Sequence, residues 1–231
     1  MTTLRTIAVH EVVQRTYPRP PRPEDEVGKA VGRAIDGTQS HFSHEFRQGR
    51  RPTATAMRTY GEVLLQEELA QAALELTPSD LVSLLAQLNG TLQAFRKSPA
   101  FGLARPRSRL LVIDRRVGVY AQPDFWDARR RFFEVKSYRA LPPPPDVALQ
   151  MRLFQLAFPG FESVLLCIDR HTTPVETSAL VVPPPTSEET LDALRFAFDL
   201  GEEFGQPKVL EYLEGPFVYY DRPGNSAGPP G

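Results

Sequence analysis

The chain has 231 residues, of which 41% are hydrophobic and 24% charged, which is an ordinary globular composition and length enough to bury one hydrophobic core. Its formal net charge of −1 excludes a global electrostatic attraction to nucleic acid, so any such binding would depend on local basic patches. The single cysteine, Cys167, excludes an intramolecular disulfide, a cysteine-ligated iron–sulfur cluster and a cysteine-rich zinc site.

The amino-terminal part of the chain is predicted to be mostly helical. Residues 4–13 alternate in a way that suits a strand or an early helix, and the proline-rich residues 17–23 must be extended because proline blocks helical and ladder hydrogen bonds. We expect a helical portion over about residues 24–98. Within it, apolar side chains at helical spacing predict helices over residues 24–48, 54–76 and 78–97.

The remainder of the chain predicts a sheet core over about residues 108–204. The order of elements indicates an α/β fold with a mixed central β-sheet flanked by helices, in one domain spanning residues 1–221. The tail, residues 222–231, is rich in Pro, Gly, Asn and Ser and is expected to be disordered. The expected core elements are a strand over 109–114, a hairpin within 119–138, a helix over 146–158, strands over 162–169 and 175–182, a helix over 186–204, and a short strand or packed arm over 209–220.

Residues 119–138 are predicted to form a β-hairpin around a basic turn. In this register residues whose numbers sum to about 258 oppose each other, so Asp124 faces Glu134 and Gln122 faces Lys136. These four side chains share one face, and apolar side chains share the other. Two opposed carboxylates destabilise a sheet unless a cation lies between them, and a divalent metal ion is the candidate. Lys136 fits as a third functional group beside the acids.

Three motifs in this chain resemble those of a known nuclease family. The pair PD at 123–124, followed after nine residues by EVK at 134–136, resembles the signature of the PD-(D/E)XK nuclease superfamily. Upstream, GTQSH at 37–41 is similar to the G-T-x-x-H helix motif of the RecB-type branch. Downstream, QMRLF at 150–154 is similar to the Q-x-x-x-Y helix of that branch, with Phe where Tyr is usual. The missing cysteines exclude the subgroup that carries an iron–sulfur cluster.

The resemblance implies a restriction-endonuclease-like core and metal-dependent hydrolysis of phosphodiester bonds, with DNA the favoured substrate, in repair, recombination or defence. Oxygen ligands suit Mg²⁺ or Mn²⁺. Lys136 would orient the attacking water or stabilise the transition state, and Gln150 would position the lysine, the water or the phosphate backbone. The resemblance implies two overlapping sets of residues: the catalytic set Asp124, Glu134, Lys136 and Gln150, and the metal ligands Asp124, Glu134, His41 and the main-chain carbonyl of Val135.

Two other functions fit the same residues. One is a non-catalytic nucleic-acid-binding or assembly subunit that retains the nuclease fold, and the other is a scaffold domain in which Asp124 and Lys136 form cross-strand ion pairs. A helicase or another repair protein is a candidate partner. Exonuclease or endonuclease action, DNA or RNA preference and oligomeric state stay open. Candidate basic patches lie at residues 47–51, 105–109, 115–116 and 129–131.

Two residues near the hairpin turn are assigned structural rather than catalytic roles. Asp127 is expected to be a turn former rather than a ligand, and for Trp126 packing is favoured over wedging against a base. The sequence shows no signal peptide and no apolar run near the length of a membrane span, so we expect a cytoplasmic protein without a membrane partner.

Overall fold

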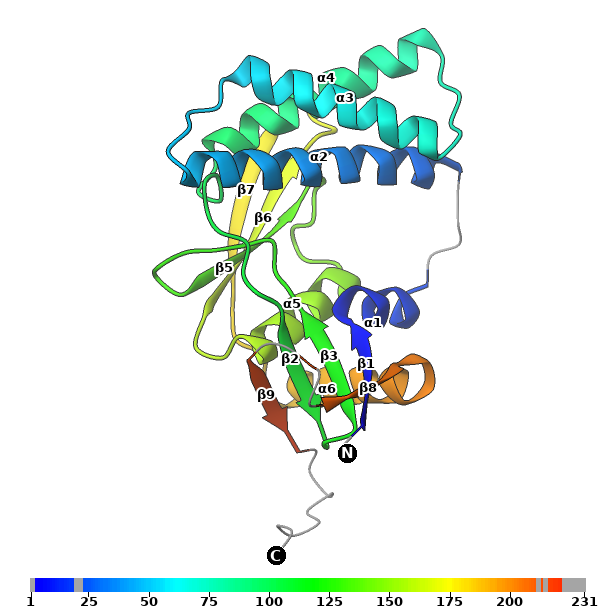
Figure 1. The fold of residues 1–231 in the computed structure, drawn as a ribbon, viewed down its shortest axis with the longest axis vertical. Helices are drawn as coiled ribbons and strands as arrows, with labels where there is room; N and C mark the ends of the chain where they lie inside the picture. Colours follow the sequence, from blue (N-terminus) through cyan, green and yellow to red (C-terminus); the bar gives the residue numbers. More distant parts are fainter. Residues whose placement is uncertain (1–2, 19–22, 211–212, 214–215, 222–231) are drawn as a thin grey trace, which may run out of the picture.

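The computed structural model describes residues 3–18, 23–210, 213 and 216–221. Within them the chain forms a mixed α/β fold with two mixed sheets (Figure 1). The predicted disordered tail lies outside the described residues, as do parts of the proline-rich segment and of the expected carboxy-terminal arm. Within the described ranges, no helix is both long and apolar enough to cross a membrane.

The predicted single central sheet is divided into a five-stranded and a four-stranded sheet. The five-stranded sheet draws strands from both ends of the chain, in the order β8 (Gln206–Val209), β1 (Thr3–Ala8), β3 (Val117–Ala121), β2 (Arg109–Ile113) and β9 (Phe217–Tyr220). The four-stranded sheet has the order β4 (Phe125–Trp126), β5 (Arg131–Lys136), β6 (Glu162–Asp169) and β7 (Glu176–Val182).

The helices predicted over residues 24–48, 54–76, 78–97, 146–158 and 186–204 are present, and a further short helix spans Val9–Thr16. Thr53, Thr77 and Thr186 each cap a helix by accepting a backbone hydrogen bond, and Thr186 and Glu189 form a capping box. The second long helix ends at Gln71, earlier than predicted. The helices are α1 (Val9–Thr16), α2 (Pro23–Arg47), α3 (Ala54–Gln71), α4 (Pro78–Lys97), α5 (Pro145–Ala157) and α6 (Ser187–Phe204).

The predicted hairpin is shared between the two sheets. Its first strand is divided into β3, which pairs with β1 and β2, and β4, which is the only part of that strand to pair with β5. The predicted register is confirmed for the two pairs that form, Phe125 with Phe133 and Trp126 with Phe132. Pro123 explains the break because it has no N–H group for a ladder and its φ angle is fixed.

Strand β5 separates the core into two packed faces. Phe133 points toward the helices α2 to α4, in a cluster with Phe42 and Phe95, whereas Phe132 packs against Phe154 of α5. Because side chains alternate along a strand, Glu134 and Lys136 continue the row of Phe132 toward α5. Helices α2 to α4 lie across one end of the four-stranded sheet (Figure 1).

Gly37 marks a close approach of two helices rather than a kink. A Cβ atom at this position would lie 2.9 Å from Cδ1 of Leu64 in α3. The glycine of the GTQSH motif therefore lets α2 and α3 pack closely, which holds the neighbouring turn of α2 against the end of the sheet.

Candidate active site

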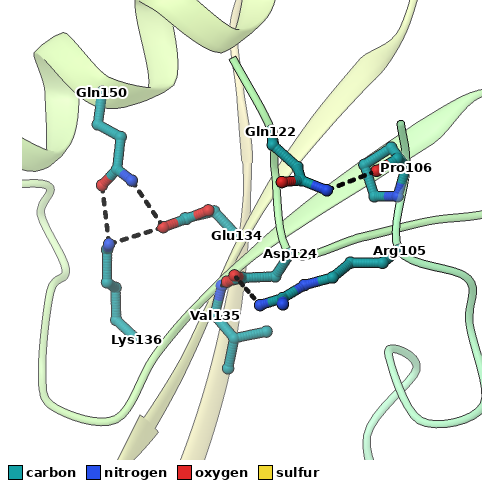
Figure 2. Close-up of polar contacts among 8 residues, drawn as sticks. All are labelled: Arg105, Pro106, Gln122, Asp124, Glu134, Val135, Lys136 and Gln150. Atoms are coloured by element: carbon teal, nitrogen blue, oxygen red, sulfur yellow. Dashed lines mark hydrogen bonds and ion pairs between the residues drawn. The ribbon is translucent and has the colours of Figure 1, made fainter. Parts of the chain in front are cut away.

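Three of the predicted catalytic residues form a closed triangle of hydrogen bonds. Nζ of Lys136 donates to Oε1 of Glu134 at 2.7 Å and to Oε1 of Gln150 at 2.8 Å. Nε2 of Gln150 in turn donates to the same Oε1 of Glu134 at 2.9 Å. Both contacts to Glu134 use Oε1, so its second carboxylate oxygen lies outside the triangle. Figure 2 shows the three side chains converging from β5 and α5.

The triangle forms because α5 returns along the face of β5 that carries the charged residues. Strands β5 and β6 are parallel neighbours, and α5 is the crossover between them. The cis peptide bond before Pro142 and the prolines that follow precede this helix, and Asp146 lies in its first turn. Glu134 is only 5% exposed, so its charge must be balanced locally, and Lys136 provides the balancing charge.

Asp124 lies beside the triangle but is held by different partners. Its Oδ2 accepts a hydrogen bond from the backbone N–H of Val135 at 2.8 Å, and its Oδ1 lies 4.0 Å from a guanidinium nitrogen of Arg105 (Figure 2). The Asp124 side chain therefore accepts the hydrogen bond of the Val135 N–H group, directly after Glu134, where the β4–β5 ladder has ended. This fixes the carboxylate close to Glu134 without a direct bond between them.

Gln122 does not face Lys136 as the hairpin register predicted. Its Nε2 donates to the backbone oxygen of Pro106 at 2.9 Å, away from Lys136 (Figure 2). The break at Pro123 removes Gln122 from the strand that pairs with β5, so the alternation of faces does not extend to it.

Asp36 is an acidic residue of this site that the sequence did not reveal. It lies on α2 directly before Gly37, and its charge interacts with those of Glu134, Arg105 and Lys136. The side chain is exposed to solvent, yet many protein atoms surround it, and desolvation, followed by repulsion from Glu134, raises its pKa to about 6. Only the placement of α2 across the end of the sheet brings this carboxylate near the others.

Asp36, Asp124 and Glu134 thus form a group of repelling carboxylates. Burial first, and then the charges of Glu134 and Asp36, raise the pKa of Asp124 well above its ordinary value, although the Val135 N–H and Lys136 oppose this. Within the described part of the chain, no group of three Asp, Glu, His or Cys side chains has the geometry to hold a metal ion. The repulsion nevertheless fits a divalent cation, because such an ion would offset several negative charges at once.

Replacing Asp36 by asparagine is expected to stabilise the metal-free protein at pH 8. The folded pKa of about 6 lies above the ordinary value of 3.8, so ionising Asp36 opposes folding at high pH, and this cost is lost as pH falls from about 6 toward 4. Urea unfolding of both proteins in EDTA at pH 8, 6 and 4 should show a stability gain at pH 8 that shrinks toward pH 4. An Asp36→Asn protein that is less stable than wild type at pH 8 would show that Glu134 and Asp36 do not repel each other in the folded protein.

His41 is not brought together with the acidic group. Its ring stacks on Tyr60 with centroids 4.4 Å apart and meets the edge of Phe42 at 4.8 Å. The side chain is exposed on α2. Its role as a ligand, like that of the Val135 carbonyl, stays a prediction.

The residues at the basic turn have the structural roles that the sequence predicted. Oδ1 of Asp127 accepts the backbone N–H groups of Arg129 at 2.9 Å and Arg131 at 3.0 Å, which makes it a turn former. Trp126 is half-buried and stacks on Phe161 with centroids 5.9 Å apart. Packing is therefore its observed contact.

Comparisons with known proteins leave the family of this chain open. No protein-family model matches it, and none of the curated proteins does. Among solved structures, one described as "Crystal structure of SSO0001" is similar to 80% of this chain over 87% of its own length, at 14% sequence identity and a TM-score of 0.36.

Proposed function

We propose that this protein is a metal-dependent nuclease with a restriction-endonuclease-like core, acting on DNA in preference to RNA. The observation that carries the proposal is the triangle of Glu134, Lys136 and Gln150 beside Asp124. The antiparallel β4–β5 pair, followed by the parallel crossover through α5 to β6, supports this proposal. Mg²⁺ or Mn²⁺ is the proposed ion.

The proposed metal ligands are Asp124 and Glu134, and Asp36 would contribute negative charge near them. When bound, the ion would lower the pKa of a water molecule and neutralise charge at the scissile phosphate. Asp124 is already fixed by Val135, and Oε2 of Glu134 is the carboxylate oxygen outside the triangle. Glu134 would therefore offer Oε2 to the ion while Oε1 stays bonded to Lys136.

Lys136 is proposed to act as a charged hydrogen-bond donor rather than as a base. Burial alone would lower its pKa, but the charge and hydrogen bond of Glu134 outweigh burial and raise the pKa above the ordinary value. An ammonium group has three N–H donors, of which Glu134 and Gln150 take two. The third can donate to a non-bridging oxygen of the phosphate, where negative charge grows during hydrolysis.

Gln150 is proposed as a positioning residue. Its amide oxygen accepts from Lys136 and its amide nitrogen donates to Glu134, so a single side chain fixes the orientation of both. Because Gln150 lies on α5 and the other two on β5, the geometry of the triangle depends on how the crossover helix packs.

Cleavage assays on several substrates would test this function. We expect the wild-type protein to hydrolyse DNA with Mg²⁺ or Mn²⁺, and Glu134→Gln to reduce the rate to background because it removes a ligand charge while keeping the shape of the side chain. The assay would compare single-stranded, duplex, flapped and circular DNA with matched RNA. The control is Glu162→Gln, which removes an exposed carboxylate at the opposite end of the four-stranded sheet.

The same assay separates the alternatives. A folded wild-type protein that cleaves none of these substrates with either ion would overturn the nuclease proposal. Binding of DNA without cleavage would instead favour the non-catalytic subunit. Absence of both binding and Mn²⁺ uptake would favour the scaffold domain.

A further inference from the structure

A second polar region lies between α4 and the turn that joins β6 to β7. In Figure 1 this turn, drawn in yellow, reaches the helical layer. The region contains a pocket with a volume of about 660 Å³, within the range of about 300–1,000 Å³ that is typical of ligand pockets. We call it the Arg170 pocket, after its most central basic residue.

The chemistry of the Arg170 pocket suits an anion. Among the described residues that line it, Lys97, Arg170 and His171 are basic or can become so, and none is Asp or Glu. Hydroxyl and amide side chains supply further hydrogen-bond donors, including those of Ser83, Gln87, Gln93, Thr173 and Thr177.

Arg170 differs from the paired arginines of the predicted basic patches. In each patch one arginine pairs with a carboxylate: Arg50 with Glu45, Arg105 with Asp124, Arg116 with Glu202 and Arg131 with Asp127. Arg170, by contrast, makes no ion pair with any described carboxylate.

Arg170 makes few hydrogen bonds within the described part of the chain. Its Nε is buried without a hydrogen-bond partner, and its only described hydrogen bond is a 3.5 Å contact to Oγ of Ser137. The adjacent Asp169 uses its Oδ1 for the backbone N–H of His171. The charge of Asp169 acts on this partly buried guanidinium without an ion-pair contact, and its unpaired Nε leaves the group suited to an anion from outside the chain.

Arg170 contacts the end of the strand that carries Glu134 and Lys136, through Ser137. This residue directly follows Lys136 at the end of β5, and Arg170 directly follows the end of β6. The two strands are parallel, with Lys136 opposite Cys167, so their ends lie at the same edge of the sheet. Ligands of α/β proteins bind preferentially at the carboxyl ends of parallel strands.

From these contacts we infer that the Arg170 pocket binds a phosphate group of the nucleic-acid strand whose scissile phosphate lies at Lys136. The inference rests on the proposed function for the identity of the ligand. Arg170 makes the main contact, and Lys97 contributes long-range attraction from α4. The phosphate belongs either to the strand interior or to a 5′ terminus, and the two sources differ in charge and position.

Fluorescence anisotropy with labelled oligonucleotides in EDTA tests the pocket without catalysis. We expect Arg170→Gln to weaken binding of single-stranded DNA by about tenfold and to reduce the slope of log affinity against log salt by about one. Lys97→Gln should give a smaller effect in the same direction. Arg195→Gln is the control, because it removes an exposed arginine on α6, which packs against the five-stranded sheet.

The oligonucleotides are used with a 5′-phosphate and with a 5′-hydroxyl. If Arg170→Gln weakens binding only of the 5′-phosphorylated strand, the pocket binds the terminal phosphate. If it weakens binding of both strands equally, the pocket binds a phosphate of the strand interior. Wild-type affinity and salt slope in both Arg170→Gln and Lys97→Gln would overturn the inference, as would a wild-type protein that binds no strand. Thermal unfolding of each variant establishes that it is folded, and Lys97→Gln remains informative if Arg170→Gln does not fold.

The outcome is independent of whether cleavage occurs. If the protein cleaves DNA but binding does not depend on Arg170, the inference about the Arg170 pocket is wrong and the nuclease proposal stands. If binding depends on Arg170 but no cleavage occurs, the inference stands and the non-catalytic subunit is favoured.

Discussion

Replacing Lys136 by methionine is expected to lower the rate of metal-dependent DNA cleavage by about 10²–10³-fold. The methionine side chain has a similar length but lacks the ammonium donor that we place on the scissile phosphate. Asp124 and Glu134 keep their carboxylates, so the variant should still bind Mn²⁺. Single-turnover cleavage gives the rate, and calorimetry with Mn²⁺ gives the binding, both at a temperature at which the variant is fully folded.

A matched substitution at another lysine isolates the effect of position. Lys208→Met removes an exposed ammonium on β8, where Nζ lies 5.1 Å from the ring centroid of Tyr120, and cleavage should be unchanged. Equal rates in Lys136→Met and wild type would rule out a role for Lys136 at the phosphate. The pH profile separates a charged donor from a base, because a lysine with a raised pKa stays protonated through pH 9. A rate that rises with an apparent pKa near 8 and loses this limb in Lys136→Met would identify a base instead.

The candidate site was predictable where the signal was local in the chain. The register of β4 and β5 follows from the positions of the apolar residues around the turn, and the structure confirms the pairing of Phe125 with Phe133. The contact of Gln150 with Glu134 and Lys136 agrees with the order of the three motifs, since a helix that follows a strand packs back on its face. Whether these residues catalyse hydrolysis is a separate question that the assays above address.

The features that sequence reasoning missed depend on contacts between distant segments. Strand β1 pairs with β3 across more than a hundred residues, and β9 pairs with β2, so no local pattern indicates that the sheet divides. Asp36 is one of five acidic residues in α2, and only packing of α2 across the sheet brings it near Glu134. The predicted pairing of Gln122 with Lys136 is wrong because Pro123 interrupts the ladder, and Gln122 instead contacts Pro106.

The pair formed by Glu134 and Lys136 also makes a large contribution to stability, and the two single substitutions should not be equivalent. Lys136→Met is expected to destabilise the protein by about 3–5 kcal/mol near pH 8, because it leaves the Glu134 carboxylate, only 6% exposed, with Gln150 as its remaining partner. Glu134→Gln should cost less. It leaves an ammonium that is 16% exposed, and it also relieves the repulsion of Asp124 and Asp36.

A double-mutant cycle measured by urea unfolding at pH 8 tests this coupling. The Glu134→Gln/Lys136→Met protein should be more stable than Lys136→Met alone, because the second substitution removes the uncompensated charge that the first leaves buried. Additive losses would mean that the two side chains are not coupled in solution. The double variant also separates folding from chemistry. A scaffold role predicts only that the double variant is more stable than Lys136→Met. The nuclease proposal predicts in addition that the folded double variant does not cleave DNA. Recovery of cleavage together with stability would therefore contradict the assignment of these two residues to the reaction.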